Sequence, residues 1–208
     1  MKLKRTANAG ILLTLDGVSI LLDGVCREVK PYPATPPEER TALMEHFPDG
    51  VCFTHSHKDH YDPGYAVAYE RETGRRVLAP GKGDCLHLGN VTVTAVPSRH
   101  IGAAGKTVQH VSFLICGTRC VWFLGDSSPL LWKERQDLPK PDVLVVPYAY
   151  ATNPTGWKIT QSLGASHVVL VHMPKREEDT LGLWEAVEKT VGQAPLLIPQ
   201  MGETLVLR

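Results

Sequence analysis

Residues Val51–Asp62 read VCFTHSHKDHYD, and this stretch decides how the rest of the chain is interpreted. The apolar run 51–53 predicts a short buried strand. Four side chains able to bind a metal ion follow it at once: His55, His57, Asp59 and His60. Zinc accepts imidazole nitrogen and carboxylate oxygen at about 2.0–2.2 Å. A loop that turns sharply after a strand can direct such side chains to two neighbouring points, so we expect it to serve two adjacent cations.

The composition is that of an ordinary globular protein. Its 208 residues, with 43% hydrophobic and 21% charged, predict one domain over residues 1–208. Lys+Arg and Asp+Glu both number 22, so the formal net charge is zero. This balance does not favour nucleic acid or an anionic membrane as a partner, and no run approaches the ~20 apolar residues of a membrane span. We expect a small-molecule substrate, and a homo-oligomer is compatible with this composition.

The cysteines indicate a reducing compartment. Their count is odd, none forms a C-x-x-C pair, and several lie in apolar runs that resemble strands. The five are Cys26, Cys52, Cys85, Cys116 and Cys120. The basic residues before the first apolar run faintly imitate a signal peptide, but Asp16-Gly17 interrupts that run and no cleavage site follows. We therefore expect buried free thiols and a cytoplasmic protein.

The rest of the chain alternates predicted strands and helices. The strands are predicted at 10–15, 18–22, 76–79, 86–87, 91–96, 107–116, 119–124, 142–146, 167–171, 196–198 and 204–207, and the helices at 36–44, 63–73, 159–163 and 177–191. Asp16-Gly17 joins the first two strands as a hairpin turn.

Polar side chains end several later strands, as His55 does after residues 51–53. His100, Asp126 and His172 stand at such ends, whereas His167 begins its strand and should lie at the opposite edge. Because strand ends at one edge of a sheet structure converge, side chains far apart in the sequence can meet there.

The H-x-H-x-D-H string at residues 55–60 resembles the signature of the metallo-β-lactamase superfamily, and Gly125-Asp126 resembles that family's G-D motif. The resemblance spans nearly the whole chain and implies an α+β fold, the four-layer αββα sandwich. It also implies two divalent metal ions, zinc first, with manganese or iron as alternatives. The implied ligands are His55, His57 and His100 for the first metal, Asp59, His60 and His172 for the second, and Asp126 as the bridge.

The same resemblance implies an enzyme. It would be a hydrolase that uses a dinuclear metal-bound hydroxide to cleave a small ester, lactone or phosphoester, with Asp59 orienting the hydroxide or returning a proton. The size and spacing are most similar to the ascorbate-6-phosphate lactonase-like branch. The alternatives are an iron-dependent persulfide dioxygenase-like enzyme, a metal-dependent nuclease or phosphodiesterase, and a binding module without catalysis.

Contacts with substrate are expected from side chains beside the predicted strand ends. The candidates are His110, Tyr148, Tyr150 and Trp157. We expect the loops at 31–37, 101–106 and 148–157 to shape the substrate site.

Overall fold

The hairpin predicted around Asp16-Gly17 forms the middle of the first sheet. It consists of β2 (Ile11–Leu15) and β3 (Val18–Leu22), with both turn residues at positive φ, 52° and 84°. The sheet has the order β11-β1-β2-β3-β4. Its other strands are β1 (Lys2–Arg5), β4 (Gly50–Cys52) and β11 (Thr204–Val206).

The second sheet has six strands in the order β10-β9-β8-β7-β6-β5. They are β5 (Cys85–Leu88), β6 (Val91–Arg99), β7 (Gln109–Cys116), β8 (Cys120–Phe123), β9 (Val143–Val146) and β10 (His167–Leu170). The antiparallel run from β5 to β8 is followed by parallel pairs between β8, β9 and β10.

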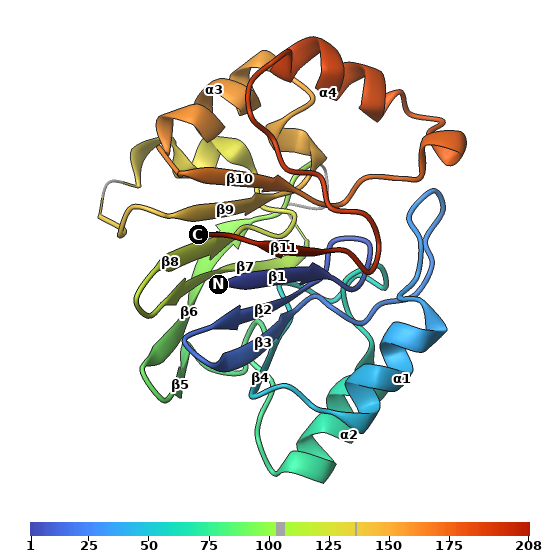
Figure 1. Cartoon of the computed structure of the whole chain (residues 1–208), viewed down its shortest axis with the longest axis vertical. Coiled ribbons are helices and arrows are strands. Elements are labelled where there is room, and N and C mark those ends of the chain that lie inside the picture. Colours follow the sequence, from blue (N-terminus) through green and yellow to red (C-terminus); the bar gives the residue numbers. More distant parts are fainter. Residues whose placement is uncertain (103–106, 136) are drawn as a thin grey trace.

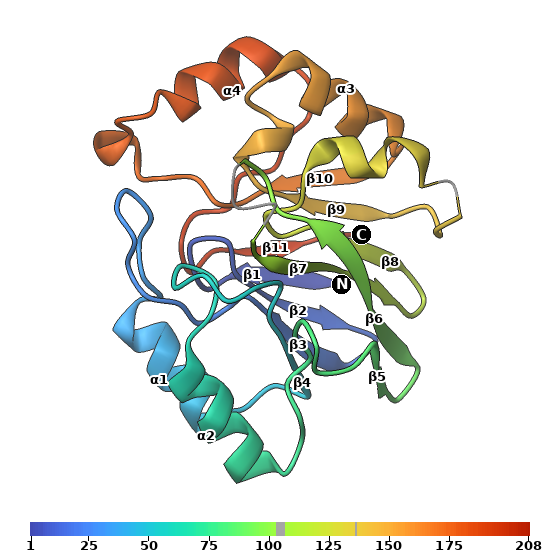
Figure 2. The ribbon, with the colours of Figure 1, turned by 180° about the vertical axis from the view of Figure 1, so that it is seen from behind.

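Helices cover the outer face of each sheet in this computed structural model (Figure 1 and, from behind, Figure 2). The α-helices are α1 (Pro37–Glu45), α2 (Pro63–Thr73), α3 (Pro154–Ser162) and α4 (Leu183–Val191), and the 3₁₀ helices are Pro129–Glu134, Tyr148–Tyr150 and Arg176–Glu178. Buried apolar side chains form one cluster between the sheets and one beneath each pair of α-helices. The predicted αββα sandwich is confirmed.

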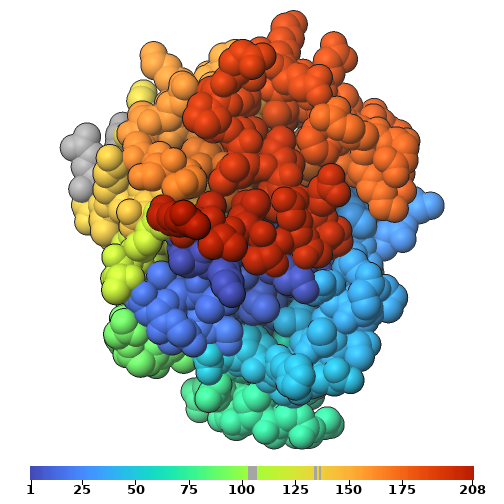
Figure 3. All heavy atoms as spheres, in the orientation of Figure 1, coloured from blue at the N-terminus to red at the C-terminus, as the bar shows by residue number. Residues whose placement is uncertain are grey.

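The structure describes residues 1–102, 107–135 and 137–208, so most of the loop predicted at 101–106 lies outside the described residues. Strand β11 pairs with β1, and in the space-filling view the C-terminal segment (red) lies against the N-terminal one (blue; Figure 3). Over these described ranges, none of the helices combines the length and hydrophobicity that a membrane span requires.

Some predicted elements differ from the observed ones. The helix expected at 177–191 is broken, because Gly182 adopts a left-handed conformation (φ 67°) and α4 begins only after it. The carboxylate of Asp179 accepts a hydrogen bond from the Trp184 amide at 2.9 Å, which holds the break. Strand β1 was not predicted, and the strands expected at 76–79 and 196–198 are reduced to the single bridges Cys52↔Leu78 and Val169↔Leu197.

The prediction of five buried free thiols is wrong for three of the cysteines. Cys116 and Cys120 face each other directly across the β7–β8 hairpin, with Cα atoms 4.4 Å apart, and form a disulfide. Cys85 is free but exposed on β5, while Cys26 and Cys52 are buried free thiols as expected. The hairpin register brings the two sulfurs together, and register is not visible in cysteine spacing alone.

Candidate metal centre

The ends of β4, β6, β8 and β10 converge at one side of the sandwich, as their sequence predicts. The Ile101 amide donates to the Asp126 carbonyl at 2.8 Å, which joins the ends of β6 and β8. The Val111 amide donates to the Thr54 carbonyl at 2.9 Å, which ties the second sheet to the loop after β4. These two backbone hydrogen bonds hold the end of β6 to that of β8, and the loop after β4 to β7, independently of any bound ion.

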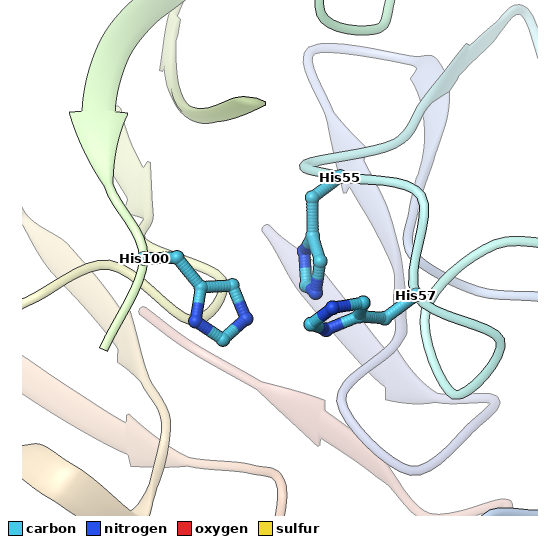
Figure 4. Close-up of side chains that lie close together, drawn as sticks. All are labelled: His55, His57 and His100. Carbon is cyan, nitrogen blue, oxygen red and sulfur yellow. The ribbon is translucent and has the colours of Figure 1, made fainter. Parts of the chain in front are cut away.

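Three imidazoles form the first group. His55 and His57 come from the loop after β4 and His100 from the end of β6, and Figure 4 shows the three rings turned toward a common point. Their ring centroids lie 4.6 to 4.8 Å apart in each pairing. One nitrogen from each ring lies within 4.8 Å of the others, so the group could hold a metal ion.

Asp59, His60 and His172 form a second group that could hold a metal ion, and all three are buried. Asp59 Oδ2 lies 3.3 Å from His172 Nε2 and 3.8 Å from His60 Nε2. His172 adopts a left-handed backbone conformation (φ 59°) directly after the strand region of β10. This conformation is costly for a histidine, and such outliers cluster at functional sites.

The carboxylate of Asp126 lies between the two groups. Its Oδ2 atom is 3.5 Å from Nε2 of His100 in the first group. The same oxygen is 3.4 Å and 3.5 Å from Nε2 of His60 and His172 in the second. Two donor atoms at tetrahedral positions about 2.1 Å from one ion lie about 3.4 Å apart, so these separations fit shared coordination.

The tautomers of three histidines are set for metal binding. His60 Nδ1–H donates to Asp23 Oδ2 at 2.8 Å, and His100 Nδ1–H donates to the Ile101 carbonyl at 2.7 Å. Thr54 Oγ1 donates its proton to Asp23 at 2.6 Å, so at 3.0 Å it can only accept from His55 Nδ1–H. Each Nε2 atom is therefore the nitrogen whose lone pair binds a metal ion once it carries no proton.

Those lone pairs need a partner. Among the described residues, Nε2 of His55, His60, His100 and His172 and Oδ1 of Asp126 are buried without a hydrogen-bond partner. An orphaned buried acceptor costs about 1–3 kcal/mol, and five in one cluster are far more than chance leaves in a folded protein. The donor set therefore fits divalent metal ions.

Asp23 is a functional residue that the sequence reasoning missed. It ends β3 at a positive φ of 47° and is fully buried. Besides His60 it accepts hydrogen bonds from the backbone amide and the hydroxyl of Thr54. Although Asp23 also groups with His55 and His60, its Oδ2 holds the far nitrogen of His60, so it orients ligands rather than completing the cluster. Asp23-Gly24 reads in the sequence only as the end of a strand.

Gly125 allows Asp126 to approach the histidine loop. A Cβ atom at this position would lie 2.6 Å from Cγ2 of Thr54, closer than real Cβ contacts, and its φ of 51° also favours glycine. The next residue, Ser127, accepts a hydrogen bond from the Trp132 indole at 3.0 Å and pairs with the Tyr150 hydroxyl at 2.8 Å. The turn that carries Asp126 is thus fixed before it by the close packing of Gly125 on Thr54 and after it by the hydrogen bonds of Ser127.

The buried groups of the cluster shift one another's pKa values. Burial opposes the charged form of His60 and of His172, but Asp126 outweighs it and raises the pKa of both, so a bound metal ion would take the place of a proton on these imidazoles. Burial, together with the charge of His60, lowers the pKa of His55, so that its imidazole is neutral. Burial opposes ionisation of Asp126, but His172 and His60 outweigh it and hold its pKa well below the usual value. The same balance, with His172 as the main partner, lowers the pKa of Asp59. Both carboxylates are therefore ionised at neutral pH.

The four residues expected to contact substrate fall into two groups. His110 is buried beside His55, with ring centroids 5.0 Å apart, and burial lowers its pKa to about 3. Tyr148 lies beside His172, at 5.6 Å between centroids. Tyr150 and Trp157 instead pack in the apolar cluster beneath α3 and α4 and are not brought to the metal groups.

Tyr32 was not singled out from the sequence, yet its ring meets that of His172 edge-on at 4.2 Å. It lies in the proline-rich stretch between β3 and α1. Only the three-dimensional fold brings this stretch over the end of β10.

Comparisons with known proteins agree with this geometry. The chain matches the sequence model of the family described as the β-lactamase superfamily domain over residues 3–172. A search of curated proteins found no significant match.

Solved structures share the fold at low sequence identity. A possible metal-dependent hydrolase from Veillonella parvula DSM 2008 is 16% identical with a TM-score of 0.72, over 100% of this chain and 99% of that one. An isothiocyanate hydrolase from Delia radicum gut bacteria is 17% identical with a TM-score of 0.68, over 100% and 99%. CmlA, a diiron β-hydroxylase from Streptomyces venezuelae, is 17% identical with a TM-score of 0.64, over 99% of this chain and 54% of its own. With the family model covering most of its length, the chain belongs to the β-lactamase superfamily.

Proposed function

We propose that this chain hydrolyses a small ester, lactone or phosphoester at a dinuclear metal centre. One observation carries the proposal: the buried Asp126 Oδ2 lies 3.4–3.5 Å from unpaired Nε2 atoms of both histidine groups. The proposed ligands are His55, His57 and His100 for one ion, Asp59, His60 and His172 for the other, and Asp126 for both. Two divalent ions, zinc in first place, would supply Lewis acidity and bring the pKa of bound water to about 7.

The chain's own residues orient the reactants. Asp59 is ionised and buried beside His172, so its free oxygen can hold a water molecule in position and then return a proton to the leaving group. We assign the catalytic role to Asp59 for this reason. His110 and Tyr148, which lie beside opposite metal groups, are the proposed contacts with substrate.

Metal content and a substrate panel test the proposal together. Purified protein should carry about two zinc or manganese ions per chain, whereas a single iron ion would favour a persulfide dioxygenase-like enzyme. The panel should contain lactones, including a sugar-phosphate lactone because of the resemblance to the ascorbate-6-phosphate lactonase-like branch. It should also contain aryl esters, phosphodiesters and an isothiocyanate, the last because a structural neighbour is named for that activity. Cleavage of phosphodiesters alone would point to the nuclease alternative.

Asp59→Ala tests the role of Asp59 as metal ligand and as catalytic group together, and metal analysis of the variant shows which of the two is lost. It should abolish hydrolysis of any substrate that the unmodified protein cleaves, because the second proposed metal then lacks one ligand and the Asp59 carboxylate no longer orients the water. The matched control is Asp137→Ala, which removes an exposed aspartate paired with Arg135 at 2.8 Å and should leave turnover unchanged. Normal turnover of the Asp59 variant would exclude this residue from the mechanism.

A further inference from the structure

Arg5 is a buried cation at the end of β1 that no carboxylate neutralises. The residue is 7% exposed, and within the described ranges it forms no ion pair. Its guanidinium donates instead to four backbone carbonyls. Nε donates to Ala7 at 3.2 Å, Nη1 to Pro199 at 3.1 Å, and Nη2 to Asn8 at 3.0 Å and to Met173 at 3.4 Å. Because burying an unpaired charge is costly, a role for this side chain must be sought in what it holds.

Two of the four carbonyls lie beside the proposed metal ligand His172. The Asn8 carbonyl accepts two hydrogen bonds, one from Arg5 and one, at 3.1 Å, from the backbone amide of His172. A carbonyl oxygen has two lone pairs, so it can accept both at once. Met173, whose carbonyl Arg5 also binds, follows His172 directly in the chain. Arg5 therefore holds the backbone on both sides of His172.

His172 depends on its backbone more than other proposed ligands do. Its φ of 59° is a conformation that a histidine keeps only where the surrounding structure holds it. Hydrogen bonds on Nδ1 orient the rings of His55, His60 and His100. Nδ1 of His172, by contrast, is buried without a partner in the part of the chain that the structure describes. The position of its ring is therefore set mainly through the backbone.

The C-terminal segment holds Arg5 in turn. The Arg5 amide donates to the Glu203 carbonyl at 3.0 Å, and the Gly202 amide donates to the Arg5 carbonyl at 2.9 Å. The loop between β1 and β2 (dark blue) and the segment before β11 (red) lie side by side in Figures 1 and 2. None of the four carbonyls that accept from the guanidinium belongs to the loop after β4 or to the end of β6, which carry the first metal group.

We propose that Arg5 is the positioning residue of His172, and that it sets the affinity of the second metal site while leaving the first unaffected. This inference rests on the metal centre of the proposed function, and it does not depend on the substrate. Arg5 touches none of the side chains assigned to the ions, so it acts only through the carbonyls of Asn8 and Met173. A guanidinium offers five N–H donors in a rigid fork, which the single ammonium nitrogen of lysine does not reproduce.

Arg5→Lys tests this role in two backgrounds that each keep one metal site. His57→Asn removes a ligand of the first group, and His172→Asn, which tolerates the positive φ, removes a ligand of the second. In the His57→Asn background, Arg5→Lys should weaken zinc binding at the remaining second site about tenfold. In the His172→Asn background, the same change should leave zinc affinity at the first site unaltered. Competition with a chromophoric chelator measures the affinity in each case.

Arg119→Lys is the matched control. Nη1 of Arg119 donates to the Leu207 carbonyl at 3.3 Å, so this arginine also ties the C-terminal segment to a neighbouring part of the chain. It lies just before β8, at the end of that strand opposite to Asp126. Its replacement should leave zinc affinity unchanged in both backgrounds.

Amide hydrogen exchange checks the contact itself. In Arg5→Lys the His172 amide should exchange faster, because its acceptor, the Asn8 carbonyl, is no longer held. The Val171 amide, which donates to the Val146 carbonyl at 2.9 Å, should exchange as before. A contribution of Arg5 to global stability alone would speed both amides together. Circular dichroism checks the fold, and Arg5→Gln, which keeps two N–H donors, replaces the lysine variant if that variant does not fold.

The titrations and the substrate panel separate this inference from the hydrolytic proposal. Equal weakening of zinc binding in both backgrounds, or weakening in neither, would overturn the positioning role of Arg5. A protein that shows the expected selectivity but cleaves no compound of the panel would refute hydrolysis and leave the role of Arg5 standing. Failure of the unmodified protein to bind any zinc would refute both.

Discussion

A single buried carboxylate outside the metal-binding set orients ligands of both proposed metals. Asp23 accepts from His60 Nδ1 and from the hydroxyl and amide of Thr54, and Thr54 in turn fixes His55. Partners of this kind set the tautomer and orientation of metal-binding histidines, and their loss costs about 10- to 100-fold in metal affinity. The position was invisible in the sequence because a strand-ending Asp-Gly pair is also an ordinary turn signal.

Asp23→Asn tests this role. The amide has one accepting oxygen for three donors, so zinc affinity should fall by about one to two orders of magnitude. Competition with a chromophoric chelator measures the affinity. The matched control is Asp16→Asn, since Asp16 also has a positive φ, 52°, and accepts from the amide and hydroxyl of one threonine, Thr118, at a remote hairpin. Equal zinc affinity in the two variants would contradict the assignment.

Asp62 shows how one residue links the motif to the next helix. It is the N-cap of α2, accepts from the Tyr65 amide at 2.9 Å and pairs with Arg40 at 3.1 Å. Burial opposes ionisation, but Arg40 and the Tyr65 amide outweigh it and lower the pKa of Asp62. Its contribution to stability is therefore fully present above the unfolded-state pKa of about 3.9 and is lost as pH falls through the lower folded-state value.

Asp62→Ala should destabilise the protein by about 1 kcal/mol at pH 7. Urea unfolding at pH 7 and again near pH 3 should show the difference from the unmodified protein shrinking at the lower pH. Glu72→Ala, which removes an exposed carboxylate at the other end of α2, serves as the control. If the stability difference between Asp62→Ala and the unmodified protein grew at the lower pH, the lowered pKa assigned to Asp62 would be wrong.

At the scale of elements, the sequence was informative where a pattern is local. Asp16-Gly17 predicted the β2–β3 hairpin, and helix α2 spans residues 63–73 as predicted. Strand β1 was missed because only Leu3 and Arg5 of its four residues are buried, so no clear apolar period stands out. The Cys116–Cys120 disulfide was missed because it depends on hairpin register.

That disulfide should matter for stability and not for chemistry. It closes the β7–β8 hairpin at the end opposite to His110 and Asp126. Replacing Cys116 and Cys120 together by serine should lower the free energy of unfolding by about 2 kcal/mol, since the closed loop is short. Zinc content and any hydrolytic activity should not change. Denaturant titration of the variant measures the free energy of unfolding, and metal analysis measures its zinc content. Loss of zinc would show that the disulfide and the metal centre are coupled along the hairpin, which the geometry does not predict.

At the scale of the whole molecule, the proposed metal ligands come from both sheets. His55, His57, Asp59 and His60 follow β4 in the first sheet, whereas His100, Asp126 and His172 follow strands of the second. The sequence predicted this meeting because each ligand, or loop of ligands, follows a predicted strand. It could not predict Tyr32, whose approach to His172 depends on how a loop folds across the sandwich.

Because each metal would join the two sheets, bound zinc should stabilise the whole fold. At a free zinc concentration a thousandfold above the dissociation constant, linkage adds about 4 kcal/mol, or about 8–16 °C in Tm for a chain of this size. Calorimetry with excess zinc and with a chelator measures the shift. His172→Asn, which tolerates the positive φ of 59°, should lose most of it, whereas His167→Asn at the other end of β10 should keep it. A Tm that is the same with zinc and with chelator would mean that the seven side chains do not hold the ions assigned to them.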